Sequence, residues 1–600
     1  MRLRPGSSLV LAAALVCALL MPGAAAAHPP PAETAPGSSS PAASGPVTGP
    51  TGSFRLVGHD PLLNRGMNAA IAIHGDYAYI GSRTDTYGDP GRAGILIVNI
   101  ADPSNPTVVG KIAAPLTANP GESSRELRVW PSKDILIVLH TNCGGPGAHE
   151  CTPPSRNSFR FFDISGSNAT NPKLITELDQ NTHEFFLWQD PANPSRALMF
   201  GGSAGSNNTA FSVWDISPVA RGEQPITVSR STHGYSRVPA TGPVEIPVGG
   251  LHSLTVSNDG RQAYFALLTG GFAVADVSDF TAGVPNPVLR PITANETRPV
   301  WPGPGTHSAL KLFGRDWVYA SDEVYGSATA PGHGCPWGWA RMIDIANPVA
   351  PTVESEYRLP PNVEANCDEW EPRPRTSYSA HNPTATPNVV FTTWHSSGVQ
   401  AISVADPRKP YQLAAFMPQP LPRVAIEDPR LSSDPDTGRG EKVVMWSFPI
   451  IKDGLIYVVD LRNGLYVLQY EGPHEGEVAQ VGFLEGNSNL GHALCFEPVG
   501  TAPASCRAGS VSAQVATTLN AVTGMRLHPG TANPLRNTLR GIAKHAGKGK
   551  QRQVCGAVDE FRHLVDDREE EGKGKGLTAL QATQLRTAAI RLASAAGCGT

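Results

Sequence analysis

Short apolar segments that end in Asp, or in another polar residue, recur along the chain from about residue 53 to about residue 486. A turn follows each segment and usually contains proline, as in ILIVNIADPSNP at 95–106 and ARMIDIANP at 340–348. Because Asp and Asn side chains stabilise turns and proline cannot continue a central strand, the pattern predicts buried strands that stop at turns. The other five copies are FRFFDISGSNATNP (159–172), AFSVWDISP (210–218), GFAVADVSD (271–279), VQAISVADP (399–407) and LYVLQYEGP (465–473).

The surroundings of these segments repeat as well. Another apolar segment precedes each copy, for example DYAYIGS at 76–82, and a third one before it starts with a polar residue, as in HSLTVS from residue 252. A fourth short segment, such as PTVVGKI at 106–112, follows the turn. Four antiparallel strands repeated seven times are typical of an all-β, seven-bladed β-propeller. A pair of β-sandwiches is the alternative, and seven copies of one pattern argue against it.

The segment ILIVNIADPSNPTVVGKI at 95–112 resembles the LVIVD-repeat family, which is found in secreted and cell-surface bacterial propeller proteins. The resemblance covers most of the chain and implies a propeller at 53–486, but it implies no reaction. The family's Asp position is held by Asp163, Asp215, Asp276 and Asp344, and is replaced by Asn99, Ser403 and Gln469 in the other copies.

Composition narrows the class of protein. The 600 residues include 48 basic and 52 acidic side chains, for a net charge of −4, which argues against a nucleic-acid binder. Only 17% of residues are charged, so long coiled coils are excluded, and 40% are hydrophobic, so wholesale disorder is excluded. The 61 Gly and 56 Pro fit many turns between short strands.

The N-terminus is typical of a secretory signal peptide over residues 1–27. Arg2 and Arg4 precede the apolar stretch SLVLAAALVCALLM, and small residues end near Ala27. We therefore expect a secreted or cell-surface protein. The apolar stretch is shorter than the ~20 residues of a membrane span, and we expect no span in the mature chain. Residues 28–52, rich in Pro, Ala and Ser, predict a disordered linker.

Cysteine usage fits export. Of nine cysteines, Cys17 lies in the expected signal, and the remaining even number suggests disulfides. Proximity in sequence suggests the pairs Cys143–Cys151, Cys335–Cys367, Cys495–Cys506 and Cys555–Cys598, although eight cysteines allow 105 connectivities. No CxxC pair is present to indicate a thiolate metal site.

The C-terminal part changes character. We expect an irregular connector at 487–530 and three helices at 531–600, because apolar residues there follow helical spacing. Thr578 followed by Gln581 predicts a capping box at the start of the last helix. The segments NPLRNTLRGIAKHA, AVDEFRHLV and LTALQATQL resemble the small FIVAR- or FIMAH-like modules of exported bacterial proteins, and a disulfide would stabilise so small a core.

Histidine placement is the strongest indication of chemistry. Four histidines start the innermost strand in four successive repeats: His183, His252, His307 and His381. In a propeller this position surrounds the axis at one end, so the imidazoles should converge. His395 ends a neighbouring antiparallel strand and should reach the same face. Converging neutral imidazoles are good ligands for Fe, Cu or Zn, and we predict such a transition metal of open identity.

Acidic residues lie next to these positions. We expect Glu126, Glu184 and Glu323 to be second-shell partners of the imidazole N–H groups. The corresponding positions of the first, second and seventh repeats hold Met67/Asn68, Arg125/Glu126 and Trp446/Ser447, so the predicted site is one-sided.

Two groups of propeller enzymes are similar in histidine placement alone. Carotenoid-cleaving oxygenases hold iron with four axial histidines, and selenium-binding-protein-like methanethiol oxidases hold copper. The similarity implies a metal-dependent oxidoreductase as the first hypothesis, with no catalytic residue assigned. GxSxG, P-loop and GxGxxG motifs are absent from the sequence.

Two alternatives stay open. The histidines can line a water-filled channel, and the protein is then a non-catalytic extracellular binding or adhesion scaffold for a small molecule, a glycan or a surface protein. The third hypothesis is a propeller polysaccharide lyase with His395 as the base and Arg125 neutralising a carboxylate. In each case we expect a monomer.

Overall fold

The computed structural model describes residues 52–83, 94–113, 123–141, 157–180, 182–203, 209–239, 246–301, 305–323, 335–370, 377–426, 442–501, 506, 511–570 and 575–598. The expected signal peptide, all but the last residue of the expected linker, and the predicted pair Cys143–Cys151 lie outside these residues.

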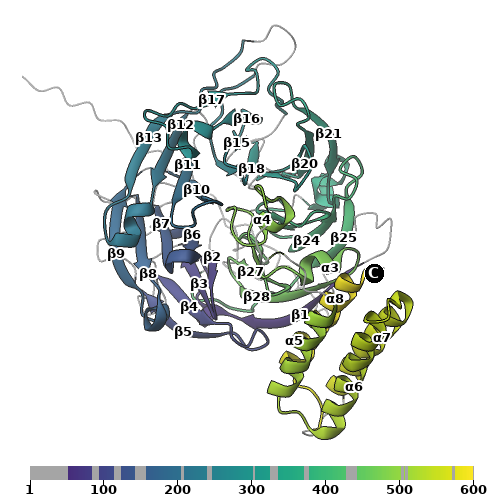
Figure 1. Ribbon diagram of the computed structural model, residues 1–600. Coiled ribbons are helices and arrows are strands. Elements are labelled where there is room, and N and C mark those ends of the chain that lie inside the picture. Colours follow the sequence, from purple (N-terminus) through teal and green to yellow (C-terminus); the bar gives the residue numbers. More distant parts are fainter. Residues whose placement is uncertain are drawn as a thin grey trace, which may run out of the picture. The chain divides into compact units, whose positions relative to one another are not determined.

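Seven antiparallel sheets follow one another around a ring (Figure 1). The first three are β2 (Asn68–His74), β3 (Tyr77–Ser82), β4 (Ile95–Asn99) and β5 (Thr107–Ile112); β6 (Ser123–Trp130), β7 (Ile135–Thr141), β8 (Ser158–Asp163) and β9 (Lys173–Asp179); and β10 (Glu184–Gln189), β11 (Ala197–Gly202), β12 (Ala210–Asp215) and β13 (Ile226–Thr232). The next three are β14 (Ser253–Val256), β15 (Gln262–Ala266), β16 (Phe272–Asp276) and β17 (Arg290–Pro291); β18 (Thr306–Lys311), β19 (Trp317–Asp322), β20 (Ala340–Asp344) and β21 (Thr352–Tyr357); and β22 (Pro383–Ala385), β23 (Val389–Thr393), β24 (Val399–Ser403) and β25 (Tyr411–Phe416). The seventh combines β1 (Ser53–Asp60) with β26 (Ile450–Lys452), β27 (Leu455–Asp460), β28 (Gly464–Glu471) and β29 (Phe483–Leu484). The predicted seven-bladed β-propeller is confirmed.

The two ends of the propeller sequence meet in the seventh sheet. Strand β1 pairs antiparallel with β28, from Ser53 opposite Glu471 to Asp60 opposite Leu465. The first strand of the described residues therefore forms the outer edge of the last sheet. This pairing closes the ring, because the seventh sheet is complete only when both ends of the propeller sequence contribute.

The recurring Asp residues form the predicted turns. The Asp163 Oδ1 atom accepts a hydrogen bond from the Ser165 backbone N–H at 2.8 Å, and three further copies repeat this geometry at the same distance. In the first sheet Asn99 takes the same role toward Ala101 at 2.9 Å. The side chain satisfies the first free N–H after the strand, which ends the ladder in the same way in each of these sheets.

Apolar cores lie between neighbouring sheets. Between the third and fourth sheets, Phe186, Phe200, Phe211 and Phe265 are buried together. Such layers occur between other pairs of sheets and account for most of the buried apolar residues. Because each sheet is covered on both faces, the inner strands are held at fixed positions around the axis.

The chain after the seventh sheet enters one end of the ring. Strand β29 pairs with β26 on its axial side, and Ser488 bridges Leu187 of β10. The Asn489 side chain accepts from the Gln189 N–H and donates to the Gln189 carbonyl, both at 2.8 Å. The short helix α4 (Ala493–Phe496) follows near the centre of the ring in Figure 1. We call residues 483–497 the axial insert.

The connector predicted at 487–530 is therefore not irregular throughout. It contains the end of the axial insert and a further helix, α5 (Val511–Gly524). Val515 and Val522 on α5 are buried in the same core as the later helices, so this segment folds because it covers their apolar faces.

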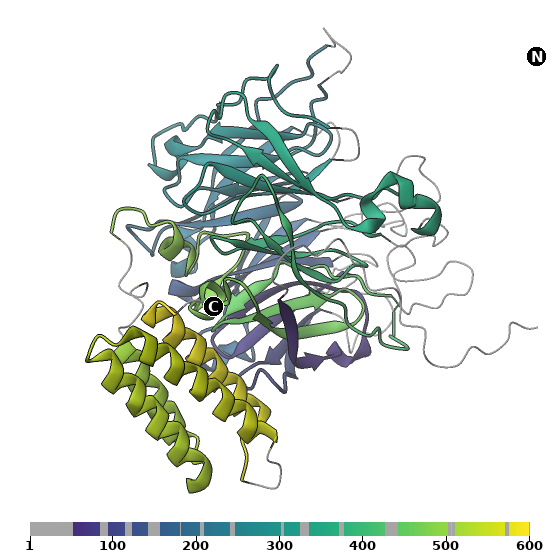
Figure 2. The ribbon, with the colours of Figure 1, turned by 90° about the vertical axis from the view of Figure 1, so that its right-hand side faces the viewer.

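Three long helices occupy the C-terminal part: α6 (Pro529–Ala546), α7 (Gln551–Glu570) and α8 (Ala579–Ala596). With α5 they lie side by side in both views (Figures 1 and 2). The predicted capping box is present, since the Thr578 hydroxyl accepts from the Gln581 N–H and the Gln581 side chain accepts from the Thr578 N–H. Three further short helices are α1 (Ser278–Thr281), α2 (Cys367–Trp370) and α3 (Glu475–Ala479).

The structure contains three of the four expected disulfides, Cys335–Cys367, Cys495–Cys506 and Cys555–Cys598. The last joins α7 to the residue that follows the C-cap of α8. Within the described residues, every helix is too short or too polar to cross a membrane.

Candidate metal centre

Backbone hydrogen bonds fix the predicted histidines at the axial end of their sheets. The His183 N–H donates to the Gly202 carbonyl at 2.8 Å, and the His252 N–H donates to the Ala266 carbonyl at 2.9 Å. The N–H of His381 likewise donates across its sheet, to the Thr393 carbonyl at 2.9 Å. Each of these three histidines is thus hydrogen-bonded to the second strand of its own sheet. The ring of sheets then determines which imidazoles are neighbours.

The structure brings all five predicted histidines together. Ring centroids lie 4.4 Å apart for His183 and His252, 4.0 Å for His252 and His307, and 4.3 Å for His307 and His381. His395 is 4.9 Å from His381. The imidazoles therefore form a continuous arc that runs from the third sheet to the sixth.

Two carboxylates lie among the imidazole nitrogens. The Glu323 Oε1 atom is 3.1 Å from His381 Nε2 and 3.3 Å from His395 Nε2, while Glu323 Oε2 is 3.4 Å from His307 Nε2. Glu184 Oε1 is 3.5 Å from His307 Nε2 and 3.8 Å from the Nδ1 atom of His252, which belongs to the fourth sheet. The expectation that Glu184 and Glu323 orient the imidazole rings stays a prediction. Both face the same atoms that would bind a metal.

Glu126 has a different neighbour. It forms a buried ion pair with Arg128 at 3.2 Å and, within the described residues, no ion pair with a histidine. The Arg128 guanidinium in turn lies over the rings of Phe185 and Phe448. Glu126 contributes negative charge near Glu184 instead of orienting an imidazole.

Hydrogen bonds determine which nitrogen of His381 carries the hydrogen. The Nδ1 atom lies 2.6 Å from the Trp446 carbonyl oxygen, which can only accept, so Nδ1 is the donor. In the neutral ring Nε2 then has a lone pair, and this lone pair faces the Glu323 carboxylate at 3.1 Å. Two acceptors face each other at this point, so a cation is required between them: either a proton or a metal ion.

His307 has the same orientation through a longer chain of contacts. The Asn382 amide donates to the Trp446 carbonyl at 3.1 Å, which turns its oxygen toward the Ser308 hydroxyl. Ser308 donates to that oxygen and therefore accepts from His307 Nδ1 at 2.8 Å. The Nε2 lone pair of His307 consequently points at the two carboxylates.

Burial controls the charges in the cluster. It lowers the pKa of His252 to about 3 and that of His395 to about 4, and it places the pKa of His183 and of His307 well below the usual range. The imidazoles of these four residues are neutral near pH 7, which is the form that binds metals.

The two carboxylates differ from each other. Burial and the nearby Glu126 raise the pKa of Glu184 well above its ordinary value. Burial would also raise the pKa of Glu323, but the imidazoles of His381 and His307, when either carries a proton, hold it well below the ordinary value. Glu323 is thus the ionised carboxylate of the cluster, whereas burial favours the neutral form of Glu184 although Arg125 and Arg128 oppose this effect.

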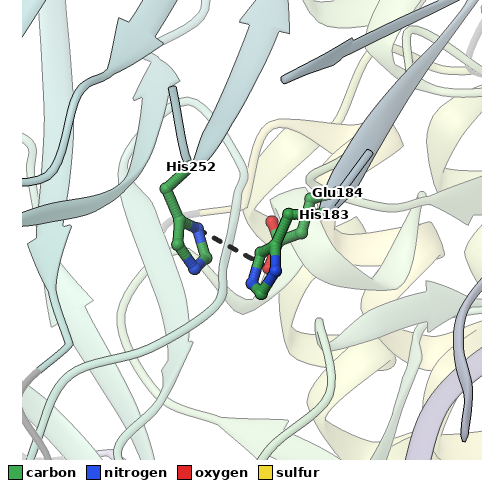
Figure 3. Close-up of side chains that lie close together, drawn as sticks. All are labelled: His183, Glu184 and His252. Carbon is green, nitrogen blue, oxygen red and sulfur yellow. Dashed lines mark ion pairs between the residues drawn. The ribbon is translucent and has the colours of Figure 1, made fainter. Parts of the chain in front are cut away.

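The potential ligand atoms fall into three groups, each with two histidines and one glutamate. They are His183, Glu184 and His252, shown in Figure 3; His252, His307 and Glu323; and Glu323, His381 and His395. Within each group the ligand atoms lie within 4.8 Å of one another, and the described residues offer no set of four with this spacing. Two imidazoles and one carboxylate form a set that binds iron or zinc and leaves coordination positions open.

Charged and aromatic groups from the remaining sheets complete the surroundings. The Trp446 ring stacks on His395 with 9° between the planes, and the Arg83 guanidinium lies 4.5 Å from the centre of the indole. Arg125 lies close enough to lower the pKa of His183, second only to burial. Asp322, the residue before Glu323, pairs with Arg341 instead of facing the histidines.

The orienting groups were not found from the sequence. The Trp446 carbonyl, Ser308 and Ser377, whose hydroxyl lies 3.1 Å from His395 Nδ1, hold the rings from behind. Only Ser308 has a sequence signal, because HS follows Gly-Leu or Gly-Thr at both 252 and 307. In the other copy, Ser253 donates to the His307 carbonyl and so links two neighbouring sheets.

Comparisons with known proteins add nothing about the chemistry of the site. No protein-family model matches the chain, and no curated protein is significantly similar to it in sequence. The crystal structure of Sqt1 from Chaetomium thermophilum is 14% identical, covers 68% of this chain and 86% of its own, and has a TM-score of 0.37. Sqt1 bound to the N-terminus of the ribosomal protein L10 is 13% identical over 69% of this chain and 88% of its own, with a TM-score of 0.37.

The C-terminal WD40 domain of Sif2 is 9% identical over 69% of this chain and 99% of its own, with a TM-score of 0.38. At these values the propeller assignment depends on the strand topology itself. Because no family model matches, the likeness to LVIVD repeats and to FIVAR- or FIMAH-like modules stays a prediction.

Proposed function

We propose that this protein is an exported β-propeller that binds a transition metal at the axial end formed by sheets three to six. The observation that carries the proposal is the lone pair of His381 Nε2 facing the Glu323 carboxylate at 3.1 Å, with the opposite ring nitrogen already committed to a carbonyl. A divalent ion relieves this conflict and binds both groups, whereas a buried charged imidazole would require desolvation of its charge.

The group of Glu323, His381 and His395 is the best-prepared site. Its oxygen-to-nitrogen distances, 3.1 and 3.3 Å, match the edges of a coordination shell with metal–ligand bonds of about 2.1 Å, for which right-angle and tetrahedral edges are about 3.0 and 3.4 Å. Both imidazoles are held from behind, by the Trp446 carbonyl and the Ser377 hydroxyl. Such contacts orient ligands and raise their basicity.

The donor set favours Fe, Cu or Zn. Imidazole nitrogen and carboxylate oxygen are present and no thiolate is within the groups, which disfavours ions that select soft ligands. Two histidines and one carboxylate leave open positions for a substrate or for O₂, so metal-dependent redox chemistry is the class of reaction we propose if the protein is an enzyme. Positive charge from Arg125 near His183 favours an anionic ligand at an open position.

Export is part of the proposal. It combines the signal-like residues 1–27 with three disulfides, which persist in oxidising compartments. We retain the secreted or cell-surface location predicted from the sequence on these two grounds.

The scaffold alternative remains a second candidate. The surroundings of His395 do not favour the lyase: its ring is fully buried, stacks on Trp446 and faces Glu323, so it is not placed as an accessible base. Metal content separates the first two hypotheses, because a scaffold with channel-lining histidines needs no metal.

The test is elemental analysis of the full chain purified without chelators, beside His381→Ala, His395→Ala and the control His233→Ala. His233 is as buried as the cluster, but its Nε2 atom lies 3.2 Å from the Gly249 carbonyl, outside the three groups. We expect transition metal in the wild type and the control, and a loss of at least tenfold in both cluster variants. Wild-type protein that binds no transition metal, even after incubation with Fe²⁺, Cu²⁺ or Zn²⁺, would overturn the proposal.

A further inference from the structure

The two oxygens of Glu323 are engaged with different histidines. Oε1 faces His381 and His395 of the sixth sheet, while Oε2 faces His307 of the fifth sheet at 3.4 Å. A carboxylate with ligand nitrogens beside each oxygen has the arrangement of a bridge between two cations.

A second set of donors lies on the Oε2 side. Glu184 Oε1 is 3.5 Å from His307 Nε2 and 3.8 Å from His252 Nδ1. His252 Nδ1, His307 Nε2 and Glu184 Oε2 are buried atoms that lack a hydrogen-bond partner. Each of these three residues is at most 5% exposed. Unsatisfied buried groups of this kind are costly, and a cation between them satisfies the nitrogens and the carboxylate together.

One ion cannot serve both sets. Ligand atoms on a single ion lie at most about 4.2 Å apart, twice a bond of about 2.1 Å. In the described residues only three residues at a time have all their ligand atoms within 4.8 Å of one another. The five imidazoles therefore belong to separate candidate metal positions along the arc. The expectation of a single ion shared by His183, His252, His307 and His381 therefore does not fit this spacing.

We propose that the axial cluster is a two-metal centre in which the Glu323 carboxylate bridges one divalent transition-metal ion held by His381 and His395 and a second held by His252 and His307, with Glu184 beside the second ion. The inference rests on the proposed function, because it adds a second ion to the same cluster. His183 lies at the end of the arc, next to Glu184 and His252, and is a further neighbour of the second ion.

Charge supports two ions. The second position has two carboxylates, Glu184 and Glu323, whereas the first has only Glu323. Within the described residues the ion-pair contacts of Glu184 are with His252 and His307, while Glu126 pairs with Arg128, so a cation at the second position would meet a carboxyl group that is in no ion pair with Lys or Arg. Two metal ions about 3.5–4 Å apart are typical of centres that bind one ligand between them. We therefore expect this centre to bind an anion or another ligand with an oxygen donor.

The experiment titrates metal-free full-length chain with Co²⁺ and measures bound metal by elemental analysis after desalting. Electron paramagnetic resonance at one and two equivalents reports magnetic coupling between the ions. The wild type should bind two equivalents and show coupling at the second. His395→Ala and His307→Ala should each bind one, and Glu323→Gln should lose the coupling, because an amide does not bridge as a carboxylate does. His233→Ala is the matched control and should bind two.

The outcomes separate the two proposals. Binding of no Co²⁺ overturns both. One equivalent in the wild type, abolished by His395→Ala and unchanged by His307→Ala, overturns the two-metal centre and leaves the single site. One equivalent abolished by both substitutions indicates one shared ion and also overturns the two-metal centre. Circular dichroism and melting temperatures beside those of the control variant identify any loss that comes from unfolding.

Discussion

Stability should depend on pH through Asp460, a fully buried carboxylate at the end of β27. Its Oδ1 atom accepts from the backbone N–H groups of Arg462 and Asn463 at 2.9 and 2.7 Å and from the Asn463 side chain at 2.8 Å. Its Oδ2 atom accepts from the Val444 N–H at 2.7 Å. Two effects therefore oppose each other: four donors favour the ionised form, and burial favours the neutral form.

Burial has the larger effect and raises the pKa of Asp460 to about 6, against an ordinary value of 3.8. Between these two pH values the folded protein holds a proton that the unfolded chain has lost, so the free energy of unfolding falls as pH rises. The pKa difference of about 2.2 between the folded and the unfolded chain corresponds to about 3 kcal/mol of stability. This stability is lost as pH rises from about 4 to about 6, and the contribution of Asp460 is constant above that range.

The assay compares the wild type with Asp460→Asn, which does not titrate. Urea unfolding followed by tryptophan fluorescence at pH 4, 5, 6 and 7, with chelator present, gives the stability difference at each pH. The wild type should lose about 3 kcal/mol relative to the variant as pH rises from 4 to 7. The reasoning is refuted if the difference stays constant, or if the wild type gains stability with rising pH, since the four donors would then outweigh burial.

Four further outcomes are expected. Replacing Cys555 and Cys598 together with Ser should destabilise the C-terminal helices by about 4 kcal/mol, because the bridge closes a loop of 43 residues, and helical circular dichroism on heating would show it. Asn489→Ala removes two partly buried hydrogen bonds to the axial strand β10 and should cost about 2 kcal/mol in urea unfolding, with Co²⁺ stoichiometry unchanged. Ser377→Ala should weaken Co²⁺ binding by about 10–100-fold in a competition titration, since it removes a group that orients His395. Arg125→Met should weaken acetate binding to the Co²⁺ protein by about tenfold or more, measured from the visible spectrum; unchanged binding would show that this guanidinium does not meet the ligand.

The propeller was predictable because its signals are local and repeated. Each copy of the Asx turn depends on one side chain and the N–H two residues later, so Asp163 and its equivalents act alike wherever the strand lies. The histidine register follows from the same repetition, since the start of the inner strand faces the axis at the same end of successive sheets.

The features that were missed depend on contacts between distant segments. Glu323 was expected beside the imidazoles, but nothing local indicates that its carboxylate lies between His307 and His381 of two different sheets. The axial insert is held by Asn489 against Gln189, 300 residues earlier, and helix α5 is buried only because later helices cover it. Tertiary packing decides these positions, and local periodicity does not contain that information.

The asymmetry of the ring bears on which ligand the centre accepts. All five imidazoles and both facing carboxylates come from the third to the sixth sheet, whereas the first, second and seventh contribute Arg83, Arg125 and Trp446. Positive guanidinium groups beside metal ions repel them, and the repulsion is strong where both are buried. An anion between the metal and Arg125 would offset it, because the anion completes the coordination shell and accepts from the guanidinium at the same time. The side of the centre without histidines therefore stabilises an anionic ligand. A neutral ligand there would leave the repulsion between the metal ions and the guanidinium groups uncompensated.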